Sequence, residues 1–199
     1  METIEKDKII EKEIQEQQRN ISYDTKEYTV EIIVKKYQER LEEEDNEFFV
    51  PDYQREFVWD DVRQSRFIES LLMGLPIPYI FLAETSDGRY EMVDGSQRIR
   101  TMAAFINDEL KLKGLDKIGE INGITFSQLP KSRQRKFLNI SLKMIVLSEL
   151  TTEESKNDIF ERINRGSDIL KEMEKRKGIY KGAFNDYIYS LAKNELYQK

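Results

Sequence analysis

The chain opens with two segments in which apolar residues recur at helical spacing. Residues 2–20 carry many charges around a thin stripe of isoleucines, and residues 28–43 place apolar side chains on one face before ending in a run of acids. Both patterns predict helices, and the thin stripe of the first gives it little area to bury. We therefore expect residues 1–46 to form an acidic helical N-terminal arm.

From residue 47 onward, strand-like alternation and helical spacing follow one another. Extended segments are expected at residues 48–59, 79–84, 89–94 and 140–150. Helices are expected at residues 60–73, 97–107, 127–139, 152–165 and 169–197. The pattern predicts an α+β fold: a small mixed sheet with surrounding helices in a core of residues 47–150, and a helical C-terminal part, residues 151–199, that packs on this core.

Composition removes several kinds of chemistry from consideration. The 199 residues include no cysteine and no histidine, so disulfides, thiolate nucleophiles, Cys/His zinc sites and imidazole acid-base catalysis are absent. The net charge of -6 is concentrated in residues 1–50, which hold 15 acids and 8 bases, and the remainder lacks the basic bias of a free-standing DNA-binding protein. No segment has the length and apolarity of a membrane span, and the N-terminus is too charged for a signal peptide. We expect a cytoplasmic globular protein without a membrane partner.

One short motif, Asp94-Gly95-Ser96-Gln97-Arg98, stands between an expected strand and an expected helix. Ser96 is the expected N-cap, and the helix N-terminus presents free backbone amides between a carboxylate and a guanidinium. This combination suits a phosphate group, with Asp94 available to hold a magnesium ion or to orient water. The alternative is an ordinary capped turn in which Asp94 pairs with Arg98. No GxxxxGK[ST] string occurs, so the motif is not a P-loop.

Three further segments contain clusters of polar or charged side chains. In residues 51–55, an arginine shares an aromatic face, where it either stacks with its tip in solvent or faces an anion. In residues 159–180, a polar cluster surrounds a tight helix junction of the kind that often faces a ligand or another domain. The basic residues of segment 131–136 lack an aromatic stacking platform and are expected to be a solvated helix face.

Taken in order, the strings PDYQR...W, GLPIP, Y.MVDGSQR..T...F and IFERIN.G..L...E.R resemble the N-terminal domain of GmrSD-type modification-dependent restriction enzymes. That domain belongs to the ParB/sulfiredoxin-like superfamily, and the resemblance covers residues 47–180. In the family the central motif usually reads DGQQR, so Ser96 stands where a glutamine is usual.

The resemblance implies a ParB-like fold and a nucleotide-binding module that controls DNA cleavage in defence against phage or modified DNA. It implies a magnesium-dependent nucleoside triphosphatase in which Asp94 assists the metal or water, Gln97 orients the attacking water or a phosphate oxygen, and Arg98 holds phosphate charge. Gly95 and Ser96 would form the phosphate turn. The remaining residues expected around the nucleotide are Tyr53, Gln54, Arg55, Asn164, Glu174 and Arg176.

The partners that this interpretation implies are a nucleotide and, indirectly, DNA. The family's nuclease is usually a separate His-Asn-His domain, which a chain without histidine does not contain, so DNA would be reached through a missing domain or a separate subunit. Two alternatives stay open: a DNA-binding or nuclease module of the ParB-like superfamily, and a non-catalytic interaction domain whose motif residues form a structural polar network. Homo-oligomerisation is a further open expectation.

Overall fold

A computed structural model describes residues 2–19, 21–51, 56–152, 154–156, 158–159 and 162. Compact packing divides the chain into one unit of residues Met1–Lys156 and a second of residues Asn157–Lys199. The first unit contains all the helices and strands described below. The expected helix at 169–197 lies outside the described residues, as does most of the C-terminal part expected at residues 151–199. Of that part, Thr151 is buried, and its hydroxyl donates to the Ser22 carbonyl at 2.9 Å.

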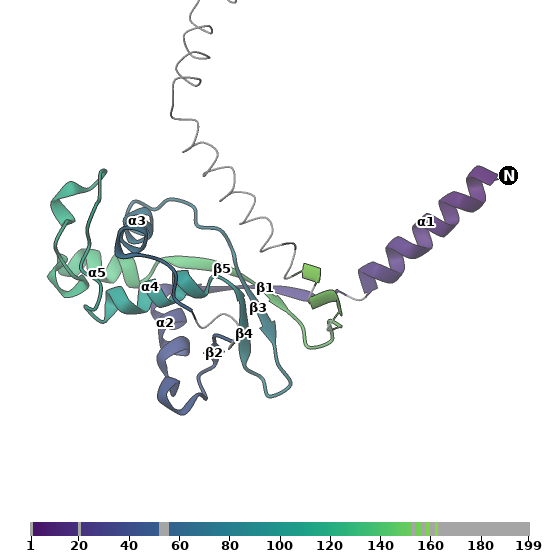
Figure 1. The fold of residues 1–199 in the computed structure, drawn as a ribbon, viewed down its shortest axis with the longest axis horizontal. Helices are drawn as coiled ribbons and strands as arrows, with labels where there is room; N and C mark the ends of the chain where they lie inside the picture. The colour runs from purple at the N-terminus through teal and green to yellow at the C-terminus, as the bar shows by residue number, and fades with distance from the viewer. Residues whose placement is uncertain are drawn as a thin grey trace, which may run out of the picture. The chain divides into compact units, whose positions relative to one another are not determined.

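The centre of the first unit is a five-stranded mixed sheet (Figure 1). Its strands, in spatial order, are β1 (Tyr23–Thr29), β5 (Ser141–Leu147), β3 (Ile80–Glu84), β4 (Tyr90–Asp94) and β2 (Phe48–Phe49). β1 pairs with β5 and β3 with β4 in antiparallel fashion, whereas β3 with β5 and β2 with β4 are parallel. The predicted α+β class is therefore confirmed.

Five α-helices are described in this unit: α1 (Glu2–Arg19), α2 (Val30–Gln38), α3 (Asp61–Leu72), α4 (Ser96–Ile106) and α5 (Lys131–Leu138). Side-chain caps start two of them: the Thr29 hydroxyl accepts from the Ile32 amide at α2, and the Asp60 carboxylate accepts from the Arg63 amide at α3. Short 3₁₀ turns lie at Leu41–Glu43, Gly119–Ile121 and Phe126–Gln128.

The helices α2, α3, α4 and α5 gather beside the strands in Figure 1, and α4 packs against both α2 and α3. Their apolar faces and the adjoining face of the sheet form one core. Its largest fully buried members are Phe48, Phe105, Phe137, Ile33, Ile68, Leu71, Ile80, Leu82, Met92, Ile99, Met102 and Leu112. The core therefore fixes both β4 and α4, the two elements that flank the DGSQR motif.

The sheet curls strongly. β1 and β2 are its two edge strands, and in a flat sheet four strand spacings would separate them by about 19 Å. The rings of Tyr28 on β1 and Phe48 on β2 are nevertheless only 6.0 Å apart, and the Lys26 ammonium on β1 donates to the Tyr90 hydroxyl on β4 at 2.7 Å. Helix α2 contacts both edges and fills the concave side.

The structure places residues 23–38 within this core, upstream of the boundary expected at residue 47. β1 pairs with β5 along its whole length, and Val30, Ile33 and Val34 of α2 are buried. The expected helix at 28–43 is shorter than predicted because β1 occupies its first positions and a 3₁₀ turn its last. The expected extended segment at 48–59 contains only the two-residue strand β2 among its described residues.

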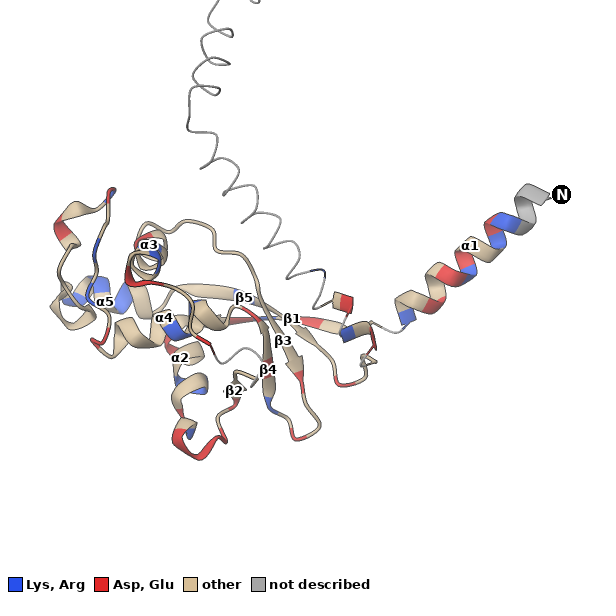
Figure 2. Cartoon of the chain, in the orientation of Figure 1, with Lys and Arg blue, Asp and Glu red and all other residues tan. Residues whose placement is uncertain are grey.

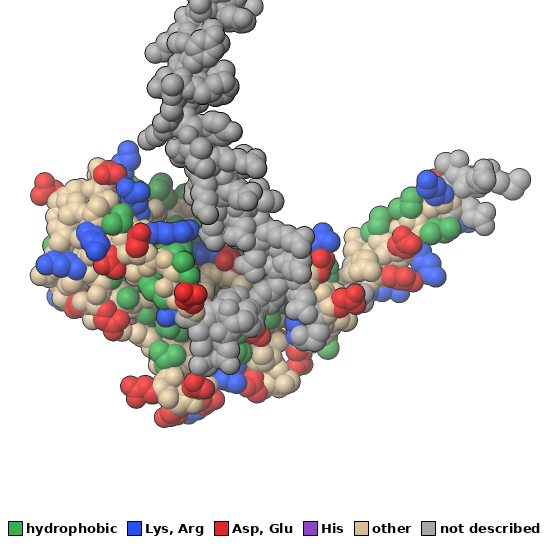
Figure 3. Space-filling view, viewed as in Figure 1, with side chains coloured by type: hydrophobic (Ala, Val, Ile, Leu, Met, Phe, Trp, Pro, Cys, Tyr) green, Lys and Arg blue, Asp and Glu red, His purple; other side chains and the backbone are tan. Residues whose placement is uncertain are grey.

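Charges of both signs cover the first unit, as Figures 2 and 3 show. The basic residues of α5 are all exposed, consistent with the solvated helix face that the sequence predicted. The side chains described in α1, residues 6–19, are exposed as well. Among the described residues, no helix combines the length and the apolarity needed to span a membrane.

Candidate functional site at the start of α4

The DGSQR motif is a tight connection between β4 and α4. Gly95 has φ of +104° and is the N-cap of α4, so Ser96 is the first helical residue and the prediction of a Ser96 N-cap was wrong. A Cβ on Gly95 would lie 3.0 Å from Cγ1 of Ile80 and 3.3 Å from Nη2 of Arg98. The turn therefore requires glycine for its backbone conformation and for its packing.

Arg98 is buried beneath this turn, with its side chain only 9% exposed. Its Nη2 donates to Oδ2 of Asp94 at 2.6 Å, and its Nη1 donates to the backbone carbonyls of Pro78 and Tyr79. Burial lowers the pKa of Arg98, and the charge of Asp94 opposes that shift. These hydrogen bonds connect the start of α4 to the loop that precedes β3.

The side-chain amide of Gln97 makes a second connection, between α4 and residues 56–59. Its Oε1 accepts from the amides of Val58 and Trp59 at 3.0 and 3.2 Å, and its Nε2 donates to the carbonyl of Glu56 at 3.0 Å. All three partners are backbone groups just after residues 52–55. Gln97 therefore positions residues 56–59 against α4.

The N-terminus of α4 keeps unused donors within the described part of the chain. The amides of Ser96, Gln97 and Arg98 donate to no acceptor among the described residues, and the Ser96 hydroxyl makes no hydrogen bond there although the residue is only 7% exposed. Unsatisfied first-turn amides and the helix dipole favour an anion at this position. The Arg98 guanidinium adds positive charge next to them.

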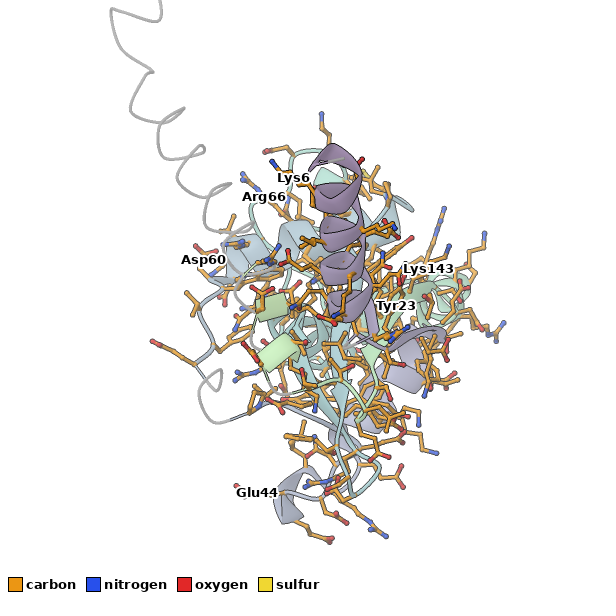
Figure 4. All side chains as sticks on the ribbon, turned by 90° about the vertical axis from the view of Figure 1, so that its right-hand side faces the viewer. Lys6, Tyr23, Glu44, Asp60, Arg66 and Lys143 are labelled. Carbon is orange, nitrogen blue, oxygen red and sulfur yellow. The ribbon has the colours of Figure 1, made fainter. Side chains whose placement is uncertain are left out.

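A cleft of about 650 Å³ opens beside the same helix. We call it the Asn46 cleft; the residues that line it include Tyr37, Asn46, Phe49, Arg89, Glu91 and Arg100. The Arg89 guanidinium stacks on the Phe49 ring at 4.8 Å, and the Arg100 guanidinium lies 4.7 Å from the centre of the Phe57 ring. Glu44 also lines the cleft, and Figure 4 shows it in the turn at the lower end of the molecule.

Sequence reasoning missed most of this cleft. Tyr37 lies in α2, Asn46 lies just before β2, and Arg89 lies just before β4. No local pattern connects the three residues. The available signal was Pro51, which begins the PDYQR string and also lines the cleft. Burial raises the pKa of Tyr37, and the positive charge of Arg100 opposes this shift, so the two side chains interact electrostatically.

The structure describes the five residues of the DGSQR motif and brings them together in one turn. Among the described residues, no group of three acidic side chains is arranged to hold a metal ion, so Asp94 would contribute a single carboxylate. The other expected site residues lie outside the described residues: Tyr53, Gln54, Arg55, Asn164, Glu174 and Arg176.

The fold and the motif define a small α+β domain with an anion-suited turn from strand to helix. The family model described as "GmrSD restriction endonuclease, N-terminal domain" matches residues 31–181, and the chain belongs to this family. It is thus a domain related to restriction and phage defence. No curated protein and no solved structure matches the chain.

Proposed function

We propose that this chain is a nucleotide-binding regulatory domain of a modification-dependent restriction system, and that the nucleotide phosphates bind at the start of α4. The observation that carries the proposal is a set of donors without an acceptor among the described residues: three consecutive amides and the Ser96 hydroxyl, beside the buried guanidinium of Arg98. A phosphate oxygen satisfies such donors and is favoured by the helix dipole.

Asp94 supports a role for magnesium in the same site. Its Oδ2 accepts from Arg98, whereas its Oδ1 accepts no hydrogen bond from a described residue, and its side chain is 34% exposed. Magnesium in nucleotide sites is commonly held by one or two carboxylates together with phosphate oxygens and water. A single carboxylate at Asp94 fits that pattern. Hydrolysis would then depend on the partner domain or DNA, because the amide of Gln97 is engaged with the backbone of residues 56–59.

The specific rival is a domain without ligand, in which the motif is only a structural network. The hydrogen bonds of Arg98 and Gln97 favour this rival, because all of those observed here tie one part of the chain to another. The two proposals differ at Ser96. The ligand proposal requires the Ser96 end of α4 to be open to phosphate, and the structural one does not.

The test is thermal stability with each of the four ribonucleoside triphosphates plus magnesium, in the wild type and in a matched pair of variants. Ser96→Glu places a carboxylate at the proposed phosphate position, where the helix dipole favours a negative charge. Ser96→Gln has the same shape without the charge and restores the residue that the family motif usually carries.

We expect at least one nucleotide to stabilise the wild type, by about 2.7 kcal/mol when its concentration is 100 times its Kd. Ser96→Gln should retain this stabilisation and Ser96→Glu should lose it. If no nucleotide stabilises the folded wild type, the proposal is wrong. Equal stabilisation of the two variants would show that the phosphates do not bind at the start of α4.

A further inference from the structure

Asn46 is a buried amide whose hydrogen bonding is half complete. The residue is 3% exposed, and its Nδ2 donates to the backbone carbonyls of Tyr37, at 2.8 Å, and Phe48. Its Oδ1 accepts no hydrogen bond from any described residue. Every fully buried side-chain oxygen among the described residues has a hydrogen-bond partner, so Oδ1 is not fully buried. Oδ1 is therefore an accessible acceptor, and the space that Asn46 lines is the cleft.

We propose that the Asn46 cleft binds the base of the nucleotide and selects a base that carries an amino group, with Oδ1 of Asn46 accepting from that group. This inference rests on the proposed function, because it assigns the phosphates of the same molecule to the start of α4. It adds a base-reading site to that phosphate site.

The orientation of Asn46 is fixed by its surroundings. A side-chain amide can present either its oxygen or its nitrogen to a ligand, and the choice depends on its other partners. Here both protons of Nδ2 face backbone carbonyls, so a rotated amide would point its oxygen at two acceptors. The cleft therefore offers an acceptor at this position, and an acceptor pairs with an N–H donor.

The walls of the cleft suit a flat heterocycle. Tyr37 and Phe49 contribute aromatic rings, and the guanidinium of Arg89 lies over Phe49 at 4.8 Å. Bases stack favourably on aromatic rings, whatever their sequence identity. The volume of about 650 Å³ is within the range of ordinary small-molecule sites and exceeds what a base alone requires.

The charges of the cleft suit a neutral group. Among the described lining residues, Arg89 and Arg100 are balanced by Glu44 and Glu91. A triphosphate in such surroundings would meet carboxylates as often as guanidinium groups, whereas a base carries no charge at pH 7. This balance separates the cleft from the start of α4, where amides and Arg98 favour an anion.

The two sites are close enough for one nucleotide. Arg100 lines the cleft and follows Ser96 by one turn of α4, which corresponds to about 6 Å along the helix axis. Glu91 lines the cleft from β4, three residues before Asp94 and so about 10 Å along the strand. Asn46 itself lies farther away: Phe48 of β2 pairs in parallel with Tyr90 of β4, so Asn46 is level with Gly88, six residues or about 20 Å along the strand from Asp94. An extended nucleoside triphosphate spans a distance of this order, with its base at Asn46 and its terminal phosphate at the start of α4.

The first experiment compares ligands that differ only by an amino group. Calorimetric Kd values with magnesium are measured for ATP against purine riboside triphosphate, for GTP against inosine triphosphate, and for CTP against the triphosphate of pyrimidin-2-one riboside. We expect the aminated member of at least one pair to bind about tenfold more tightly, because its analogue leaves the Asn46 oxygen without a donor.

The second experiment fills the cleft without disturbing Asn46, whose amide holds the chain at Tyr37 and Phe48. Leu41 lines the cleft and is 42% exposed, so Leu41→Trp introduces bulk at its rim. Leu75→Trp is the matched control at an apolar residue that is 48% exposed and does not line the cleft. Leu41→Trp should abolish the tenfold preference and keep binding of inorganic tripolyphosphate, whereas Leu75→Trp should change neither.

The outcomes separate this inference from the proposed function. If tripolyphosphate and all four nucleoside triphosphates bind but none of the three pairs shows a preference, the base-reading role of Asn46 is refuted and the phosphate site stands. A preference that survives in Leu41→Trp places the base elsewhere and also refutes it. If tripolyphosphate fails to bind the wild type, the phosphate site is refuted. In that case adenosine and purine riboside, which lack phosphates, test the cleft alone. Equal binding of the two, or no binding of either, refutes the base-reading role of Asn46.

Discussion

At the scale of single residues, the pair formed by Asp94 and Arg98 is asymmetric. The side chain of Arg98 is 9% exposed, whereas that of Asp94 is 34% exposed. Removal of the Asp94 charge therefore leaves a guanidinium in low dielectric without its anion, which costs more than the loss of an exposed ion pair. We expect Asp94→Asn to lower the free energy of unfolding by about 3 kcal/mol, measured by urea denaturation.

The control for this prediction is the same substitution at an exposed aspartate. Asp87 also pairs with an arginine, Arg89, at 2.7 Å, and its side chain is 51% exposed. Hydrogen bonds from Thr85 and Arg89 lower the pKa of Asp87 to about 2, but solvent screens the pair, so Asp87→Asn should have a much smaller effect. Equal losses in the two variants would contradict the role assigned to burial.

The residue scale also shows where sequence reasoning fails. The pairing of Asp94 with Arg98 was foreseeable, because residues four apart at the start of a helix lie close together. It was one of the two interpretations of the motif. The N-cap residue of α4 was not foreseeable, because Gly95 adopts φ of +104° and takes the N-cap position itself. The bonds of Gln97 to Val58 and Trp59 were also unpredictable, since they join positions almost forty residues apart.

At the scale of elements, Gln97 joins α4 to the segment of residues 56–59. A single amide group bonds three backbone groups of that segment. Gln97→Met keeps the length and helix preference of the side chain but removes all three bonds. We expect the amides of Val58 and Trp59 to exchange with solvent about tenfold faster in this variant, measured by hydrogen exchange with NMR detection.

An internal reference in the same spectra controls for global destabilisation. The amide of Lys113 donates to the hydroxyl of Ser65 on α3 at 3.0 Å and has no contact with Gln97. Its exchange rate should stay unchanged. If all three amides exchange faster by the same factor, Gln97 stabilises the whole domain and not the segment in particular.

Strand β1 illustrates why some elements escape sequence analysis. Its sequence, YDTKEYT, is polar because it is an edge strand with mostly exposed side chains, so the apolar alternation that marks a half-buried strand is weak. Its existence depends on pairing with β5, more than a hundred residues later. In contrast, β3, β4, β5, α3 and α4 bury regular apolar faces, and their predicted positions are confirmed to within a few residues.

At the scale of the whole molecule, local motifs predicted the turn at α4 but not the Asn46 cleft. The turn is contained in five consecutive residues, whereas the cleft combines residues from α2, β4, α4 and the connections around β2. Only the curl of the sheet, which brings its two edges together around α2, makes these segments neighbours. A single sequence carries no signal for such an arrangement.

The same curl determines where the folding unit begins. The family model starts at residue 31, yet β1 lies before that position and pairs with β5 through all seven of its residues. Val30, which follows it directly, is fully buried in the core.

We expect deletion of residues 2–20, whose described side chains are all exposed, to change Tm by no more than about 2 °C. Deletion of residues 2–30 should abolish cooperative unfolding, because it leaves β5 as a bare edge and a cavity at Val30. Calorimetry of the two truncated chains measures both effects. A cooperative transition at the wild-type Tm after the longer deletion would show that residues 31–199 are sufficient and that β1 is dispensable.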